Sequence, residues 1–207
     1  MYVDKKNYFY YITTTNENYE HPPMIEGAEQ SIIKGMHKIE SAENPNIRLI
    51  GSGAILRESI RAKSILDTYK IKSEVWSVTS FNLLRKDGME VERFNQLNPD
   101  LEEKISYVEE CFDGESIPVI ASTDYMRSYA EQIRPYIKAK YNVLGTDGYG
   151  RSDSREMLRG FFEINASSIV RASAYSLFKE GTIDKKQLDI IYNDMGVDSS
   201  KPNPWEV

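Results

Sequence analysis

The chain has 207 residues, 40% of them hydrophobic, which is enough to bury one good core, so we expect a single soluble domain with appendages. Its formal net charge of −6, with Lys and Arg interleaved among Asp and Glu, argues against a nucleic-acid partner, because phosphate-backbone binding needs clustered basic residues. No run approaches the roughly 18 apolar residues of a membrane span, and the N-terminus lacks the apolar core of a signal peptide, so we expect a cytoplasmic protein with no membrane partner.

The pattern of the N-terminal segment is typical of the last strand of a preceding domain followed by a linker. Residues 8–15 are rich in aromatic and β-branched types, which favours a strand. The polar stretch 16–21 and the pair Pro22-Pro23 then interrupt regular structure. We therefore hypothesise that the chain is the C-terminal piece of a longer protein, in which residues 1–24 are the end of the preceding domain and a linker.

The pattern of strands predicts the fold class. After a short helix around residues 26–32, segments 35–39 and 47–50 flank a polar turn that contains a proline, which predicts an antiparallel hairpin. Three more strands are predicted at residues 74–79, 118–122 and 141–145. Helical or polar stretches long enough for crossovers separate them. We predict a three-layer α/β domain of about five strands, mostly parallel with one antiparallel.

Apolar residues at helical spacing predict the helices between and after these strands. One begins near Ile55, and another follows Ala121 with Met126, Tyr129, Ala130, Ile133 and Ile137 on one face. A helix is also predicted over residues 157–162. Two more close the fold, the first ended by Gly181 and the second capped by Asp184 and ended near Gly196.

The segment 145–155 is the most informative part of the sequence. Three glycines in six residues allow the backbone to turn sharply, and Ser152, Asp153 and Ser154 can accept the free N–H groups of the helix that follows. At such a junction of strand and helix an α/β sheet presents groups that face ligands or partners. The same pattern fits a plain connection, so the segment alone defines no chemistry.

Two other strand ends invite a functional interpretation. Residues 51–53 begin like a dinucleotide-binding fingerprint, but Leu56 stands where a third glycine is required, so a tight turn is favoured. Residues 122–125 lie ahead of a helix, where Ser122 or Asp124 is expected as an N-cap rather than as a catalytic group.

The remaining candidates for chemistry are few. Cys111 is the single cysteine and is interpreted as a small hydrophobic residue. His21 and His37 have no neighbouring Ser and Asp in a triad arrangement and form no Cys/His cluster at metal spacing. We therefore assign no catalytic, cofactor-binding or metal-binding residue in this chain.

Eight short sequence motifs, spread almost from end to end of the chain, resemble those of a known family. They are residues 16–19, 23–24, 26–29, 51–53, 75–81, 121–126, 145–156 and 181–186. They closely resemble the C-terminal part of the homodimeric, thiamine-diphosphate-dependent pyruvate dehydrogenases of bacteria, which belong to the transketolase-like enzymes. The motif at residues 145–156 is highly specific for this family. The resemblance implies a transketolase-like C-terminal domain over residues 25–207, preceded in residues 1–24 by the end of a pyrimidine-binding domain and a linker.

The resemblance also implies an activity for the full-length enzyme, which decarboxylates pyruvate with thiamine diphosphate and Mg²⁺ and transfers the acetyl group to lipoyl-lysine. The segment that holds the cofactor in the family is absent from this sequence, so no cofactor is expected in this chain. The implied partners are the remaining domains of the same enzyme, a homodimer partner and the dihydrolipoyl acetyltransferase component. We expect this piece to serve assembly and dimerisation and to be inactive alone.

An interface, or an element that approaches the active site, is the hypothesis for the glycine-rich loop, with a structural turn as the alternative. Its candidate residues are Asp147, Tyr149, Arg151, Ser152 and Asp153. Two other functions stay open. One is an independent module that binds a small anion or metabolite at the strand ends near residues 51–53 and 145–154. The other is a hydrolase that uses Ser122 or Ser152.

Overall fold

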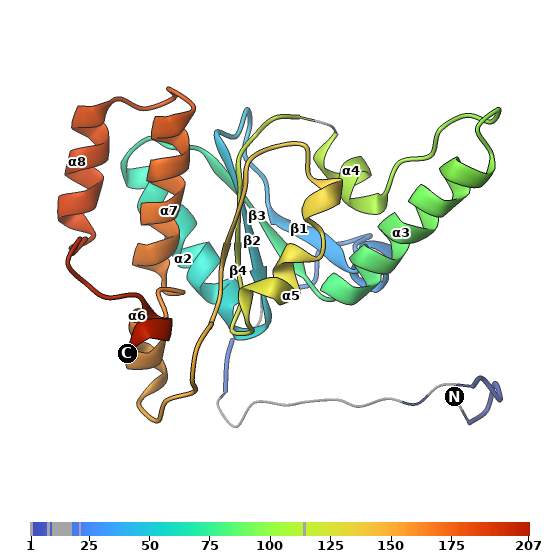
Figure 1. Ribbon diagram of the computed structural model, residues 1–207, viewed down its shortest axis with the longest axis horizontal. Coiled ribbons are helices and arrows are strands. Elements are labelled where there is room, and N and C mark those ends of the chain that lie inside the picture. Colours follow the sequence, from blue (N-terminus) through green and yellow to red (C-terminus); the bar gives the residue numbers. More distant parts are fainter. Residues whose placement is uncertain (1, 8, 10–17, 21, 114) are drawn as a thin grey trace.

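A five-stranded sheet is the middle layer of the computed structural model, which describes every residue except 1, 8, 10–17, 21 and 114 (Figure 1). The strand order is β1-β3-β2-β4-β5. The strands are β1 (Met36–Glu40), β2 (Ile47–Ser52), β3 (Ser73–Val78), β4 (Val119–Ser122) and β5 (Tyr141–Leu144). Strand β1 pairs antiparallel with β3, and the other neighbours pair in parallel, which confirms the predicted α/β fold. The strand hypothesis for residues 8–15 falls largely outside the described residues.

The predicted hairpin between segments 35–39 and 47–50 is wrong. Both segments are strands, but β1 pairs with β3, placing Met36 opposite Val78, and β3 lies between β1 and β2. Residues 47–51 of β2 are all buried, whereas most of β1 is only half-buried. A strand covered on both faces takes a central place among parallel neighbours, and the polar turn before it is long enough to pass one strand position.

Helices cover both faces of the sheet (Figure 1). The alternation of side chains along β2 sends Ile47 and Leu49 to one face and Ile50 to the other. The first face packs against α2 (Leu56–Thr68) and α7 (Ala166–Lys179), and α8 (Lys185–Asp194) packs against α7. The second packs against α3 (Phe81–Leu97), α4 (Tyr107–Phe112) and α5 (Arg127–Glu131).

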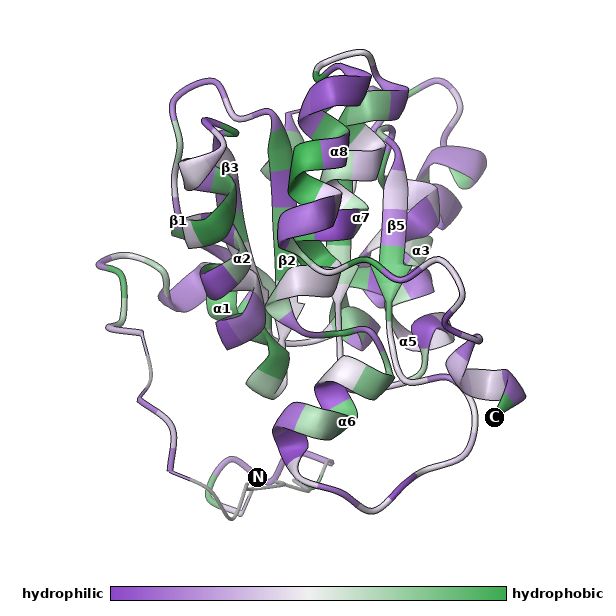
Figure 2. Ribbon diagram, turned by 90° about the vertical axis from the view of Figure 1, so that its left-hand side faces the viewer, coloured by the Kyte–Doolittle hydropathy of each residue, from purple (hydrophilic) through white to green (hydrophobic). Residues whose placement is uncertain are grey.

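Two short helices lie at the margins of the sandwich: α1 (Glu29–Lys34), which precedes β1, and α6 (Arg155–Phe161), which follows the glycine-rich loop. Figure 2 shows β2 as a mostly hydrophobic ribbon, while the ribbon of α8 alternates between hydrophobic and hydrophilic residues. This contrast is the one expected between a covered strand and a helix with one wet face. In the described part of the chain, no helix has the length and apolar character needed to cross a bilayer.

The capping residues predicted for the two C-terminal helices are confirmed. Gly181 adopts a φ of +76°, and the N–H of Thr182 donates to the carbonyl of Leu177 at 2.9 Å, which satisfies the end of α7. The Asp184 side chain accepts a 2.7 Å hydrogen bond from the N–H of Gln187 and so caps α8. These signals act within a few residues, so the sequence pattern is sufficient to place them.

The single helix predicted after β4 is interrupted. Helix α5 ends at Glu131, and a separate 3₁₀ turn follows at Arg134–Tyr136. Pro135 supplies no N–H and its ring obstructs the preceding turn of a helix, so an α-helix cannot run through it. Ala130 and Ile133 are nevertheless buried together, so the apolar face was identified correctly although the element was not.

Candidate functional site

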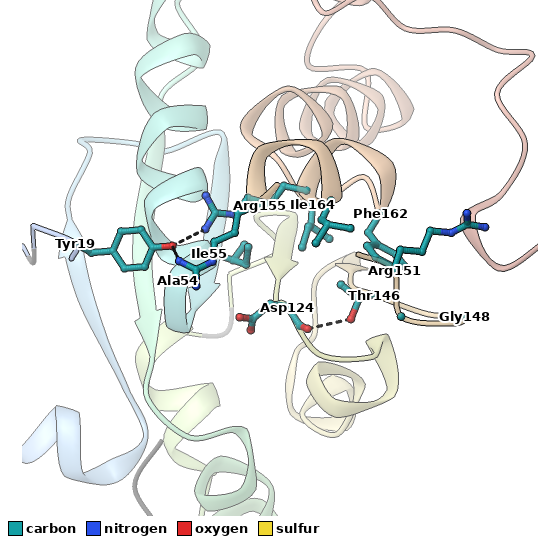
Figure 3. A pocket seen from close by; sticks show the side chains of 13 residues that line it. Tyr19, Ala54, Ile55, Asp124, Thr146, Gly148, Arg151, Arg155, Phe162 and Ile164 are labelled. Carbon is teal, nitrogen blue, oxygen red and sulfur yellow. Dashed lines mark hydrogen bonds between the residues drawn. The ribbon is translucent and has the colours of Figure 1, made fainter. Parts of the chain in front are cut away.

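The carboxyl edge of the sheet gathers the loops that the sequence singled out. Strands β3 and β4 lie on opposite sides of β2, so the connections that leave β2 and β4 diverge and open a crevice between them. A cavity of about 390 Å³ lies at this edge. It is lined by Ala54 after β2, by Asp124 after β4, by Thr146 and Gly148 after β5, and by residues of α6 (Figure 3).

The walls of this cavity differ in chemistry. Ile55, Leu158, Phe162 and Ile164 form an apolar wall, and three of the four are buried. The hydroxyl of Thr146 donates to the backbone carbonyl of Asp124 at 2.9 Å, which ties the loop after β5 to the loop after β4. The cavity therefore combines a rigid apolar wall with polar groups on two connected loops.

Arginines converge on Tyr19 beside the cavity. Nη1 of Arg155 and Nη2 of Arg159 each donate to the Tyr19 hydroxyl oxygen at 3.2 Å. The Arg57 guanidinium lies over the Tyr19 ring, 4.6 Å from its centroid. Figure 3 shows the Tyr19 hydroxyl directed at the Arg155 side chain. Arg57 belongs to α2, while Arg155 and Arg159 are one turn apart on α6, so two helices present guanidinium groups to one phenol.

Glu58 holds one of these arginines in place. The carboxylate is buried, and it accepts hydrogen bonds from the N–H of Ala166 at 3.0 Å, from Arg61 at 3.0 Å and from Arg159 at 3.3 Å. Because Ala166 is the first residue of α7, the contact links α2, α6 and the start of α7. The guanidinium of Arg159, whose side chain is only 17% exposed, is thereby fixed before any ligand arrives.

The predicted loop residues have distinct places. Asp147 accepts a 3.0 Å hydrogen bond from the backbone N–H of Arg127 and forms an ion pair with Nε of the Arg127 side chain at 3.3 Å. It therefore caps α5 from a distant loop. Tyr149 is 90% exposed. Gly148, at a φ of +102°, packs against Trp205, because a Cβ on this residue would lie 3.0 Å from the Trp205 Cα.

The other three predicted residues do not converge either. Arg151 lines the cavity with its guanidinium over the Phe161 ring, at 4.5 Å from the centroid. Ser152 and Asp153 are exposed, and the Asp153 carboxylate accepts from the N–H of Ser154 at 2.7 Å. Ser154 in turn caps α6. Of the five residues proposed from sequence, the structure brings only Arg151 to the cavity.

The expected cap at residues 122–125 is wrong. The residue before α5 is Met126, which offers no side-chain cap, and Asp147 supplies the acceptor instead. Asp124 lines the cavity, and the Ser122 hydroxyl is buried with no hydrogen-bond partner among the described residues. His37 lies on β1, three strand spacings or about 14 Å from β4, so it cannot activate Ser122.

The tight turn at residues 51–53 is confirmed. A Cβ on Gly51 would lie 2.5 Å from the Cα of Leu56, and Gly53 adopts a φ of +54°. Both positions are set by the close approach of strand β2 to the helix that follows. The glycines are therefore explained by local packing.

No site for a metal-bound cofactor is found among the residues that the structure describes. They contain no group of three or more His, Cys, Asp or Glu that could hold a metal ion, so they do not fit the Mg²⁺ of a thiamine diphosphate site. Cys111 is not an activated nucleophile, because burial raises the pKa of its thiol.

The sequence reasoning missed Tyr19, Glu58, Arg155 and Arg159 as members of a site. A signal was present, since Arg57 and Arg61 on one helix and Arg155 and Arg159 on another are spaced by four residues and so share a helix face. What the spacing does not contain is that the two pairs face each other, because about a hundred residues separate them.

Comparison with known proteins defines the class. The model of the transketolase-like TK C-terminal domain matches residues 35–165. The chain belongs to this family of domains. Transketolases from Pichia stipitis (TM-score 0.54, 16% identity, 78% of this chain and 21% of that one) and Leishmania mexicana (TM-score 0.52, 17% identity, 74% and 20%) share the fold.

Among curated proteins, the pyruvate dehydrogenase E1 component of Pseudomonas aeruginosa is 49% identical over 211 residues, covering 100% of this chain and 24% of that protein. The corresponding component of Escherichia coli (strain K12) is 47% identical over 209 residues, covering 99% and 23%. These matches confirm the resemblance found in the sequence. The chain spans about a quarter of the length of these relatives.

Proposed function

We propose that the chain is the C-terminal domain of the decarboxylating first component of a cytoplasmic pyruvate dehydrogenase complex. The observation that carries the proposal is the 49% identity to a pyruvate dehydrogenase E1 component over the whole of this chain. In the full-length enzyme, thiamine diphosphate and Mg²⁺ would supply the electron sink for decarboxylation of pyruvate and transfer of the acetyl group to lipoyl-lysine. This domain would contribute contact surfaces for assembly of that enzyme.

The role of the domain is assembly, and it is inactive alone. Its partners are the remaining domains of the same enzyme, a homodimer partner and the dihydrolipoyl acetyltransferase component. Large apolar side chains are more than half exposed on the loops and helix of the carboxyl edge: Tyr125, Met126, Tyr149 and Met157. Apolar side chains gathered on a surface are typical of protein interfaces, which supports this edge as the contact surface.

A segment exchange tests the proposal. The matching segment of the Escherichia coli relative is replaced by this chain, and turnover of pyruvate is measured beside the unmodified relative. We expect an active chimera, and we expect this chain alone, with thiamine diphosphate and Mg²⁺, to release no carbon dioxide from pyruvate. Carbon dioxide release by the purified chain would contradict the assembly role. A folded, dimeric chimera without turnover would contradict membership of the pyruvate dehydrogenase enzyme.

A further inference from the structure

We propose that Tyr19 anchors the linker (residues 18–25) to this domain and thereby fixes how the domain is oriented relative to the part of the enzyme that precedes it. Tyr19 is in this sense a positioning residue for assembly. The proposal rests on the function proposed above, because it requires a preceding part of the enzyme. The contacts that carry it all lie within this chain.

The hydroxyl and the ring of Tyr19 are held separately. The hydroxyl oxygen accepts hydrogen bonds from Nη1 of Arg155 and Nη2 of Arg159, each at 3.2 Å (Figure 3). The Arg57 guanidinium lies over the ring, 4.6 Å from its centroid. Hydrogen bonds from charged donors are stronger than those between neutral groups, and a guanidinium over an aromatic ring adds an attraction of its own. One linker side chain is therefore bound to both α2 and α6.

One of these arginines is fixed independently of the linker. Arg159 also donates to the buried Glu58 carboxylate at 3.3 Å, and its side chain is only 17% exposed. Glu58 in turn accepts the N–H of Ala166, the first residue of α7, at 3.0 Å. Ordering a long side chain costs conformational entropy, and the contact with Glu58 already restricts Arg159. Tyr19 therefore binds to a socket that α2, α6 and α7 have formed in advance.

The linker is stiff between this anchor and α1. Pro22 and Pro23 restrict the backbone to extended conformations. They line a hollow of about 510 Å³ together with Ile39 of β1 and Ile60 of α2. The linker thus stays beside the body of the domain until α1 begins at Glu29.

The anchor shortens the free connection to the preceding part of the enzyme. Residues 8–15 are the predicted last strand of that part, so about four residues, or about 14 Å at full extension, separate it from Tyr19. Without the anchor, the connection would run to α1 at Glu29, about 14 residues and about 50 Å away. A shorter tether raises the effective concentration of surfaces that must meet in one assembly. Loss of the Tyr19 contacts should therefore weaken assembly while the domain stays folded.

Limited proteolysis of the 207-residue chain tests the anchor itself. Glutamyl endopeptidase cleaves after Glu20, which is exposed and adjacent to the anchor. Tyr19→Ala should raise the initial rate of this cleavage, followed by mass spectrometry, by about tenfold, because cleavage follows the population of the released linker. Tyr19→Phe keeps the ring under Arg57 and should give an intermediate rate. Tyr175→Ala, at a half-exposed tyrosine of α7, is the matched control and should be cleaved as the wild type is.

Sedimentation of the chimera with the Escherichia coli relative tests the role in orientation. Tyr19→Ala should raise the dissociation constant of the dimer by about tenfold, because the surfaces of this domain are no longer held in place. Tyr19→Phe should recover part of that loss. Far-ultraviolet circular dichroism of the 207-residue chain should be the same in the wild type and in both variants, which separates orientation from folding.

The two proposals fail in different ways. A dimeric chimera that lacks turnover contradicts the function proposed above, and dimer affinities can still be compared in it. Cleavage of Tyr19→Ala at the wild-type rate would show that Tyr19 does not anchor the linker. Faster cleavage together with wild-type dimer affinity would show that the anchor does not set the orientation of the domain, and either result overturns the inference.

Discussion

Two arginine clusters lie at opposite edges of the same sheet, and they differ in how their charges are buried and paired. At the amino edge, the buried Arg48 donates to the Glu74 carboxylate at 2.6 Å and to the Phe112 carbonyl at 3.3 Å. Its guanidinium also lies over the Phe112 ring. At the carboxyl edge, Arg155 and Arg159 both donate to the Tyr19 hydroxyl oxygen, and Arg159 also donates to the buried Glu58 carboxylate at 3.3 Å.

The difference is one of balance between charges. Glu74 is buried between two cations, because Lys38 contacts it at 2.8 Å and Arg48 at 2.6 Å, and it also accepts from the Trp76 indole N–H. The buried charges of this cluster are therefore paired with one another, and the cluster contributes to the stability of the fold. At the carboxyl edge Glu58 is buried as well, but Arg61, one of the two arginines that pair with it, has a side chain that is 61% exposed, so this cluster stays open to solvent.

The largest effect is expected from opening the closed cluster. Glu74→Gln removes the buried carboxylate beside Arg48 and leaves only the exposed Glu115 carboxylate in contact with it, so it should lower the free energy of unfolding by about 3–5 kcal/mol, as measured by urea denaturation. Glu115→Gln is the matched control, because Glu115 also contacts Arg48 but its side chain is 54% exposed. It should cost less than about 1 kcal/mol. Equal losses in the two variants would show that burial does not distinguish the two contacts.

The pH dependence of stability should separate the two edges. Burial alone would raise the pKa of Glu74, but hydrogen bonds from Lys38, Trp76 and Arg48 outweigh it and leave the pKa below its ordinary value of 4.5. A lowered carboxyl pKa stabilises the fold above the unfolded-state pKa, and this contribution is lost as the pH falls through the folded-state pKa.

Urea denaturation between pH 6 and pH 3 should therefore show a decline in stability that is smaller in Glu74→Gln than in the wild type. Arg57→Gln, at the open edge, should keep the wild-type decline, because Arg57 lies over the Tyr19 ring and arginine does not titrate in this range. A Glu74→Gln variant with the full wild-type decline would remove Glu74 as a source of acid sensitivity.

A smaller loss is expected from the loop that caps α5. Asp147→Ala removes the acceptor for the Arg127 N–H and should lower the free energy of unfolding by about 1 kcal/mol. Asp147→Asn keeps an oxygen acceptor and should recover most of that loss. If Asp147→Ala were as stable as the wild type, the contact would contribute nothing to the open edge.

The smallest effect on stability is expected at Tyr149, which is 90% exposed. Tyr149→Ala should change the free energy of unfolding by less than about 0.5 kcal/mol. In the chimera with the Escherichia coli relative it should lower dimer affinity or turnover, measured by sedimentation and by pyruvate consumption. Tyr2→Ala, a similarly exposed position near the N-terminus, serves as the control. Wild-type assembly and turnover in Tyr149→Ala would remove the loop as an interface.

The sequence by itself determined the local features of this protein. The strand segments, the caps at Asp184 and Gly181 and the tight turn at residues 51–53 all rest on patterns within a few residues. Such patterns act through local hydrogen bonds and backbone geometry, so they survive without knowledge of the fold.

Only the tertiary structure decided which distant segments meet. Strand β1 pairs with β3 rather than with β2 because the sheet as a whole buries β2 at its centre. Asp147 caps a helix that begins twenty residues earlier, and Tyr19 and Glu58 reach α6 across more than a hundred residues of chain. These contacts depend on packing over long sequence separations, and no local pattern contains that information.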